Sequence, residues 1–180
     1  MKKWKIAFGL AAFIAMGLAA VLLWQTHQIK EDLLREYILE HASLEQALAI
    51  ALEEYESSGN ARQLSADLVA AHGQSQVVMQ PASVRKLTGR YFRDDIPYLA
   101  ELQGTWDYNL MLAIQDTMVP ARSGEVSEEQ VDELKEHYDT LFDFNQILLS
   151  NQFEEKSLAE LESDIEKFYI KYVFDGRYGF

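Results

Sequence analysis

The spacing of apolar residues divides the chain into two regions. From Ile6 to Trp24 it carries nineteen uncharged and almost wholly apolar residues. A helix of that length rises roughly 28 Å at about 1.5 Å per residue, close to the ~30 Å hydrocarbon core of a bilayer. Because a helix satisfies its own backbone hydrogen bonds, we expect residues 6–24 to form a transmembrane helix.

The charges that flank this apolar segment predict its orientation. Lys2, Lys3 and Lys5 precede it, whereas basic and acidic residues are mixed in the region that follows. Positive residues close to a span are retained on the cytoplasmic side. We therefore expect a single-pass protein of the cell membrane, with residues 1–5 in the cytoplasm and residues 25–180 outside it.

A cleaved signal peptide is the alternative reading of the same segment. Leu18-Ala19-Ala20 is a tolerable cleavage site, but the apolar residues continue beyond it to Trp24. Nineteen residues also exceed the roughly 7–15 of a typical signal-peptide core. These features favour an uncleaved signal-anchor, and both readings place the rest of the chain outside the cytoplasm.

One face of the predicted span is made of small side chains. Ala7, Ala11, Ala15 and Ala19 recur every four residues. Small residues at this spacing let two helices approach closely in lipid, so this face is a candidate helix–helix contact and a homodimer is one possible assembly. Alanine is also common in membrane helices in general, which is the simpler explanation.

After Trp24 the apolar residues follow helical spacing instead of a continuous run. The steps are three or four residues, as expected for one buried face of a helix. No helix-breaking residue occurs before Ser57-Ser58-Gly59-Asn60, so we expect the span to continue outward as one rod. The predicted stripe consists of Leu33, Tyr37, His41, Leu44, Leu48, Ala51 and Tyr55.

The remaining sequence predicts further helices and no alternating strand pattern. We expect helices at 61–80 and 83–119, the second either kinked or divided near Asp94 ahead of Pro97, and then a loop over 120–126. Capping boxes that begin at Ser127 and Ser157 open two more helices. The predicted fold is all-α: a single N-terminal transmembrane helix that continues into an extracytoplasmic antiparallel bundle of four to five helices.

Composition narrows the range of partners. All 29 acidic residues but only 13 of the 16 basic residues follow Trp24, which leaves the outer domain with a net charge of −16. A surface of this sign repels nucleic acid and anionic lipid, and it suits cations or basic partners. The chain has no cysteine, which excludes disulfides, thiolate metal sites and cysteine nucleophiles.

No local motif indicates a reaction. The residues three positions before the four histidines are Trp24, Ile38, Val69 and Leu134, so the Glu-x-x-His pairs of carboxylate-bridged metal bundles are absent. The sequence also lacks His-Glu-x-x-His, a Gly-x-Ser-x-Gly elbow and phosphate-binding glycine loops. We expect no catalytic residue, metal or cofactor, although a site assembled from distant residues remains an alternative.

Two polar residues interrupt the predicted core stripes. His41 lies between Tyr37 and Leu44, where it could act as a pH-sensitive contact or pack half-buried with a hydrogen bond to a neighbouring helix. Asn145 occupies a core position of its helix, where a buried amide can fix the register between helices. We favour the architectural reading for both.

The one basic cluster outside the predicted span is interleaved with aromatic residues. It could hold an anionic ligand or partner, or it could balance the charge of acidic helices nearby. The cluster consists of Arg85, Lys86, Arg90, Tyr91, Phe92 and Arg93.

These observations favour a non-enzymatic protein that binds another envelope or membrane protein. With only residues 1–5 on the cytoplasmic side, any signal would have to pass through a partner. The layout of one span running into a long helix is similar to the helical sensor domains of bacterial chemoreceptors and kinases. That similarity implies a ligand-sensing bundle as the alternative function.

Overall fold

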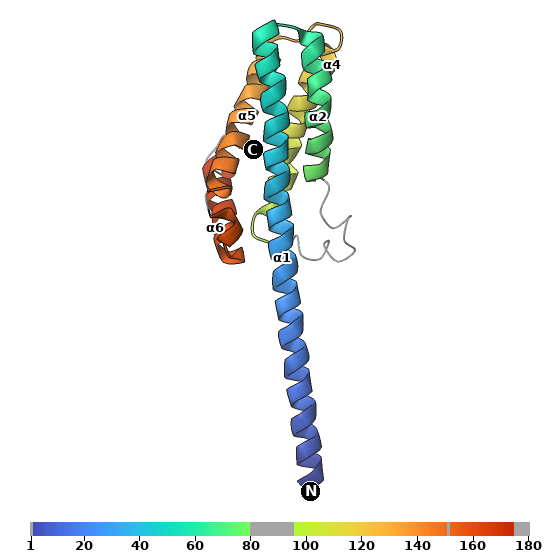
Figure 1. Cartoon of the computed structure of the whole chain (residues 1–180), viewed down its shortest axis with the longest axis vertical. Helices are drawn as coiled ribbons and strands as arrows, with labels where there is room; N and C mark the ends of the chain where they lie inside the picture. The colour runs from blue at the N-terminus through green and yellow to red at the C-terminus, as the bar shows by residue number, and fades with distance from the viewer. Residues whose placement is uncertain (1, 80–95, 151, 175–180) are drawn as a thin grey trace.

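The computed structural model describes residues 2–79, 96–150 and 152–174, with side chains from residue 11 onward. Within these ranges every regular element is a helix and no strand is present, which confirms the all-α prediction (Figure 1). In chain order the elements are α1 (Lys2–Ser58), α2 (Ala61–Met79), α3 (Leu99–Glu101), η4 (Leu102–Asp107), α4 (Tyr108–Ala121), α5 (Glu128–Leu148), η5 (Phe153–Glu155), α6 (Leu158–Tyr169) and η6 (Ile170–Phe174).

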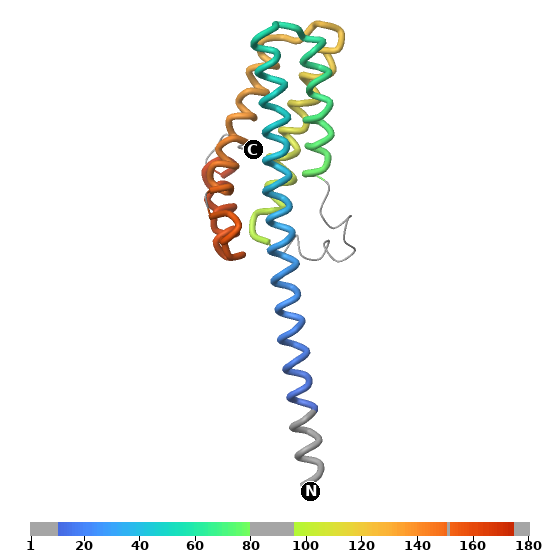
Figure 2. The backbone as a smooth tube through the Cα atoms, viewed as in Figure 1, coloured from blue at the N-terminus to red at the C-terminus, as the bar shows by residue number. Residues whose placement is uncertain are grey.

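Helix α1 is the longest element and joins the two regions seen in the sequence. Its 57 residues run without a break from the N-terminal rod into the helical domain (Figure 2). In the rod, large apolar side chains such as Phe13, Leu23 and Trp24 are 63–73% exposed. The helix is long and apolar enough to cross a membrane, although a signal sequence would pass the same test.

The second half of α1 packs into the domain. Of the predicted stripe, the residues from Leu33 to Ala51 are buried and Tyr55 is partly buried against the core. The buried face is wider than predicted, because Leu34, Ile38 and Leu52 are also enclosed. Its neighbours are α2, α5 and α6, so this half of α1 is covered from several directions.

Helix α2 returns alongside α1 after a tight turn. Gly59 adopts φ 61°, a left-handed conformation that glycine reaches without the steric penalty of a Cβ. The helix begins at Ala61 as predicted and is described up to Met79. One face, which includes Leu64, Leu68 and Val78, contacts α1 and α4.

The start of the next helical segment differs from the prediction. A division near Asp94 would place Pro97 in the first turn of a new helix, but Pro97 lies in a turn and the helix begins at Leu99. Tyr98 occupies the left-handed region at φ 63° and interrupts helical geometry at this point. The question of one kinked helix or two rests on residues 80–95, which lie outside the described ranges.

The loop predicted at 120–126 begins slightly later. Pro120 is in the last turn of α4, and the helix continues to Ala121. The nearby chain reverses through Gly124, whose φ is 89°. At the other end of the chain, the glycine- and aromatic-rich tail from Phe174 to Phe180 suggests packing against the helices. Phe174 is instead 74% exposed, and residues 175–180 lie outside the described ranges.

Both predicted capping boxes are present. The hydroxyl groups of Ser127 and Ser157 accept hydrogen bonds from the backbone N–H groups of Gln130 and Glu160, whose side chains bond back to the serine N–H groups. Two of the four unpaired N–H groups at each helix start are thereby satisfied. These boxes fix where α5 and α6 begin.

Two basic side chains hold the connection between α5 and α6. Arg35 of α1 donates to the carbonyl oxygens of Phe153 and Lys156 and to the carboxylate of Glu31. Lys156 donates to the carbonyls of Ile147 and Leu148 and pairs with Asp164 at 2.9 Å. The Lys156 ammonium thus satisfies two of the last carbonyls of α5 and interacts favourably with the helix dipole.

Candidate functional site

The most elaborate polar arrangement in the structure is buried where α1 meets η4. His41 of α1 has no exposed surface, and its Nε2 lies 2.7 Å from Oδ1 of Asp107. The hydroxyl of Tyr37, one turn earlier on α1, donates to the other oxygen, Oδ2, at 2.8 Å. The Asp107 side chain is 1% exposed. The sequence expectation of a hydrogen bond to a neighbouring helix is therefore confirmed, and the burial of His41 is complete instead of partial.

The π-helical geometry of η4 brings Asp107 into this position. A π turn holds one residue more than an α turn, and such insertions shift which side chains face inward. Trp106 and Asp107, although adjacent, are both buried. The indole of Trp106 stacks on the His41 ring with centroids 5.1 Å apart and planes 9° apart. Phe144 of α5 covers the His41 ring from another direction at 4.7 Å.

The hydrogen bonds of His41 show how many protons the histidine and Asp107 share. Its Nδ1 is 2.8 Å from the Tyr37 carbonyl oxygen, which can only accept, so Nδ1 carries a hydrogen. The contact between Nε2 and Asp107 therefore holds one further proton, on the ring or on the carboxyl group. Either location leaves the pair neutral overall, which lowers the cost of burying it.

The phenol of Tyr37 remains protonated in this setting. Burial raises the pKa of Tyr37 well above its usual value, and the neighbouring Asp107 raises it further through its charge and the hydrogen bond. Asn145 extends the network, because its amide donates to the His41 carbonyl at 3.3 Å and to Glu45 at 2.6 Å. The predicted role of Asn145 as a buried polar core residue agrees with its 3% exposure.

These features fit a device that fixes the packing of helices. The ring of His41 is packed between aromatic side chains, and the side chains of His41 and Asp107 are buried. A substrate therefore has no access to their nitrogen and oxygen atoms in this conformation. The hydrogen bonds of Asp107 join η4 to α1 and those of Asn145 join α5 to α1, so an imperfect register would leave a buried polar group unpaired. The network therefore specifies how three segments pack.

Sequence reasoning missed Asp107 because the π turn is not visible in the spacing. Trp106 and Leu110 are four residues apart, as on one face of an α-helix, and both are buried. In a regular α-helix Asp107 would be expected nearer the polar side. One signal was available: His41 in a core stripe needs a hydrogen-bond partner, and Asp107 adjoins a tryptophan whose size favours burial.

A second site is an acidic groove between α4 and α5 with a volume of about 670 Å³. His137 lines it and is 7% exposed, and burial lowers the pKa of this histidine from 6.5 to about 4. Within the described ranges no group of three His, Cys, Asp or Glu residues is placed to hold a metal ion. The groove is lined by Asn109, Leu112, Ala113, Asp116, Glu133, Glu136, His137, Asp139 and Thr140.

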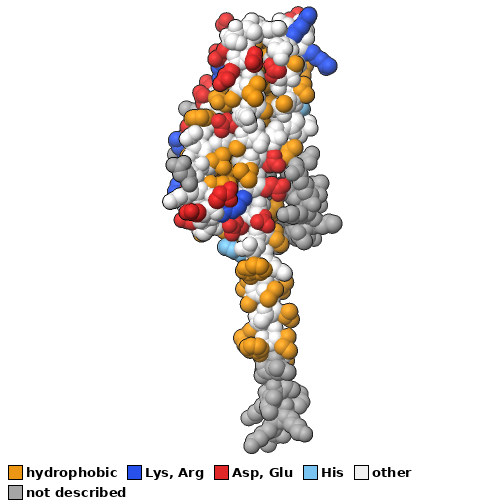
Figure 3. Space-filling view, in the orientation of Figure 1, with side chains coloured by type: hydrophobic (Ala, Val, Ile, Leu, Met, Phe, Trp, Pro, Cys, Tyr) orange, Lys and Arg blue, Asp and Glu red, His pale blue; other side chains and the backbone are white. Residues whose placement is uncertain are grey.

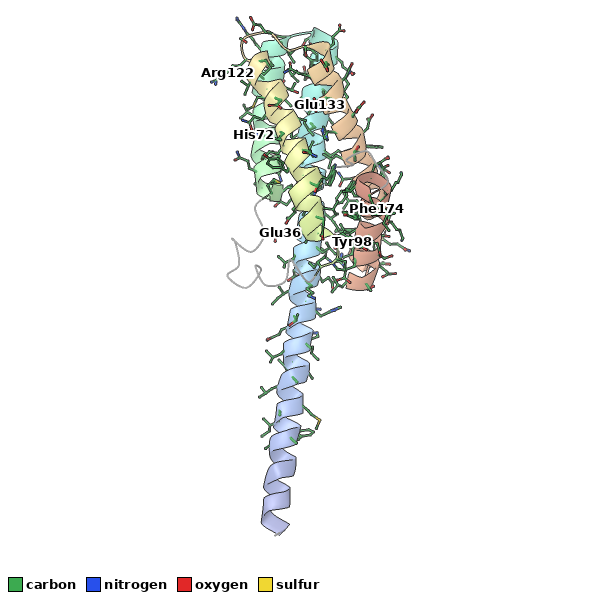
Figure 4. All side chains as sticks on the ribbon, turned by 180° about the vertical axis from the view of Figure 1, so that it is seen from behind. Glu36, His72, Tyr98, Arg122, Glu133 and Phe174 are labelled. Atoms are coloured by element: carbon green, nitrogen blue, oxygen red, sulfur yellow. The ribbon has the colours of Figure 1, made fainter. Side chains whose placement is uncertain are left out.

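A third site consists of two grooves that flank the outer side of α2. The α1–α2 groove, of about 370 Å³, is lined by Ser43, Gln46, Ala47, Ile50, Ala66, Asp67 and Ala70. The α2–α4 groove, of about 440 Å³, is lined by Arg62, Ser65, Ala66, Val69, Met118, Val119 and Arg122. We call the two grooves and the ridge of α2 between them the α2 face. Arg122 lies at the end of the domain farthest from the N-terminus (Figure 4).

The charged side chains are unevenly distributed over the molecule. Acidic groups are spread over the visible side of the helical domain, whereas the rod below it shows hydrophobic side chains (Figure 3). The predicted basic–aromatic cluster at 85–93 lies outside the described residues. Of the predicted small-residue face of the span, Ala11, Ala15 and Ala19 are exposed on α1, and the side chain of Ala7 is not described.

Comparison with known proteins gives no relative. No protein-family model matches the chain, and no curated protein or solved structure matches it.

Proposed function

We propose that this chain is a membrane-anchored helical bundle that stands outside the cytoplasm and acts by binding another envelope protein, without enzymatic activity. The observation that carries the proposal is the continuity of α1. One helix carries apolar side chains that are exposed from Ala11 to Trp24, and its second half is part of the domain core. If the apolar segment spans a membrane, such a helix fixes the distance between the domain and the bilayer.

The length of α1 supports a role at a fixed height. From Gln25 to Ser58 the helix rises about 50 Å at 1.5 Å per residue. Because its second half is packed against α2, α5 and α6, it does not act as a flexible linker. A partner would therefore meet the far end of the domain at a defined distance from the bilayer.

The arrangement of polar groups supports binding over catalysis. His41 and Asp107, the pair best suited to proton transfer, are enclosed and fix the packing of helices. The exposed features are grooves and apolar side chains instead, including Val69, Val119 and Ile50. Grooves with exposed apolar side chains are the usual material of protein contacts.

The absence of cysteine allows a direct test of topology. Single-cysteine variants Lys3→Cys and Glu129→Cys are exposed to a membrane-impermeant maleimide in right-side-out membrane vesicles. Glu129 is exposed on α5, so the second variant should be labelled at once. The first should be labelled only after the vesicles are opened. The reverse pattern would contradict the proposed orientation, and a mature N-terminus after Ala20 would contradict the anchor.

The binding role is tested by crosslinking the full-length anchored chain in cells. A short lysine-reactive crosslinker should link it reproducibly to one envelope protein, identified by mass spectrometry. Recovery of the chain alone, or crosslinked only to itself, would count against a partner-binding role.

A further inference from the structure

Helix α2, which forms the ridge of the α2 face, carries far less charge than α5. The 19 residues of α2 include two charged side chains, Arg62 and Asp67. Helix α5, of 21 residues, carries seven acidic side chains. A low charge is unnecessary for a helix side that faces only water, and depletion of charge is typical of the centre of protein interfaces.

The shape of the α2 face suits another helix. Ala66, Ala70 and Gly73 are small and lie along the exposed side of α2, with grooves on both sides. A Cβ added at Gly73 would meet no atom within 4 Å, so this end of the ridge is open. Helices pack by placing the ridges of one into the grooves of the other, and small residues allow a close approach.

Exposed branched side chains from three helices line these grooves. Ile50 of α1, Val69 of α2 and Val119 of α4 are 51%, 61% and 59% exposed. Single exposed aliphatic residues are ordinary on protein surfaces. Here they flank one uncharged ridge, and a docked helix would cover them together.

Two arginines mark one end of the face. Arg62 and Arg122 both line the α2–α4 groove and are exposed, and neither makes an ion pair within the described part of the chain. The full chain has a net charge of −13, so free cations beside an apolar groove are unusual for it. Arginine recognises carboxylates through paired hydrogen bonds.

The position of these arginines excludes lipid headgroups as the acidic group. Arg62 follows the end of α1, about 50 Å along the helix from Trp24 at 1.5 Å per residue. The anionic groups of the bilayer that holds α1 are therefore out of reach. The carboxylates must belong to another protein.

A symmetric pair of chains centred on the two arginines is unfavourable. Two copies anchored in one membrane and related by an axis along its normal present the same residues at the same height. If that axis passed close to Arg62 or Arg122, the arginine would lie beside its own copy, and like charges repel. A different protein with acidic residues avoids this conflict.

We propose that the α2 face is the docking site for a helix of a partner protein, uncharged along its contact stripe and acidic at the end that meets Arg62 and Arg122. This proposal rests on the proposed function and specifies the surface and the chemistry of the partner. Apolar contact along the ridge would supply affinity, and the arginines would set the direction of the docked helix.

Photocrosslinking in cells tests the proposal with the full-length chain. A photoreactive amino acid replaces Val69 on the α2 face or, as a control, Phe142 on α5, which is 42% exposed. The Val69 probe should capture a single protein at least tenfold more efficiently than the Phe142 probe. The captured peptide should be an uncharged helical segment with acidic residues at one end.

Charge reversal then separates docking from chance proximity. Arg62→Glu with Arg122→Glu should lower capture by the Val69 probe about tenfold. The control variant carries Lys167→Glu and Lys171→Glu, which make the same change in charge at exposed sites of α6 and η6. Capture by the Val69 probe should remain unchanged in this variant. Thermal unfolding of each variant in nanodiscs verifies that it folds. A synthetic peptide of the captured segment should lose affinity for the intact chain when its acidic residues become amides.

Several outcomes would overturn the proposal. They are capture of a second copy, capture that ignores the arginine reversal, and a captured segment without acidic residues. Capture by the Phe142 probe alone would leave the proposed partner-binding function intact and refute the α2 face as the site. Capture by neither probe would count against both.

Discussion

The two halves of α1 differ in how many apolar residues they carry, in how these are spaced and in what surrounds them. Between Phe13 and Trp24 the large apolar side chains are 51–73% exposed and point in all directions around the helix. Between Leu33 and Leu52 the buried residues form one side of the helix, with Leu44 and Leu48 at 0%, whereas Leu39 and Ile50 on other sides are 49% and 51% exposed. One continuous helix thus presents an apolar cylinder at one end and an apolar stripe at the other.

This difference teaches that the amount and the spacing of apolar residues together decide the environment of a helix. A helix that is apolar all round has no side for water and needs lipid or a protein interior. A helix with one apolar stripe needs neighbours on that side and water on the other. Helix α1 meets both conditions in turn without a change in backbone geometry.

The largest expected effect comes from placing charge in the first half. Leu18→Arg combined with Leu22→Arg puts two arginines into the apolar cylinder, and each costs about 2.5–3.5 kcal/mol for insertion at a span centre. The fraction of protein that stays in membranes after an alkaline carbonate wash should fall to near zero. Leu39→Arg, on the exposed side of the packed half, is the matched control and should remain in the pellet. Equal retention of both variants would refute the membrane role of the first half.

The next effect is expected at the polar centre of the packed half. Asp107→Ala removes the partner of His41 and Tyr37 and leaves buried polar groups unpaired. The free energy of unfolding in urea should drop by about 3–5 kcal/mol. The control Asp116→Ala changes an exposed carboxylate on α4, which directly follows η4, and should alter the free energy of unfolding by less than about 0.5 kcal/mol. Similar losses for both variants would mean that the network does not hold the packed half together.

A smaller and pH-dependent change in the free energy of unfolding is expected from His137. This residue lies on α5, which packs against the second half of α1. Burial lowers the pKa of His137 to about 4 in the folded state, below the 6.5 of an exposed histidine. The unfolded chain therefore binds the proton first as the pH falls, and the free energy of unfolding should decrease between about pH 6.5 and 4. At about 1.4 kcal/mol per pKa unit, the loss is up to about 3 kcal/mol.

The measurement is a set of urea unfolding curves across that pH range. His137→Gln should show a shallower pH dependence than the parent chain, whereas His27→Gln, at an exposed position of α1, should not change it. Subtracting the curves removes the contribution of the groove carboxylates Asp116, Glu133, Glu136 and Asp139. An unchanged slope for His137→Gln would contradict the burial of this side chain.

Local sequence patterns were sufficient for most helix positions. The lack of a breaker between Trp24 and Ser57 predicted one rod, and the serine capping boxes predicted where α5 and α6 begin. These features depend on residues within a few turns of one another. The start near Pro97 was misplaced because Tyr98 adopts a left-handed conformation that its sequence does not signal.

The sequence by itself determined the helical class, the apolar cylinder and stripe of α1, and the core positions of His41 and Asn145, since these follow from helical periodicity. The tertiary structure decided which groups satisfy those buried polar residues. It also decided that α2 lies between α1 and α4 with an uncharged ridge and two arginines exposed. The physical reason is that partners 66 or more residues apart, such as His41 and Asp107, are brought together by packing and by a π turn, neither of which leaves a local pattern.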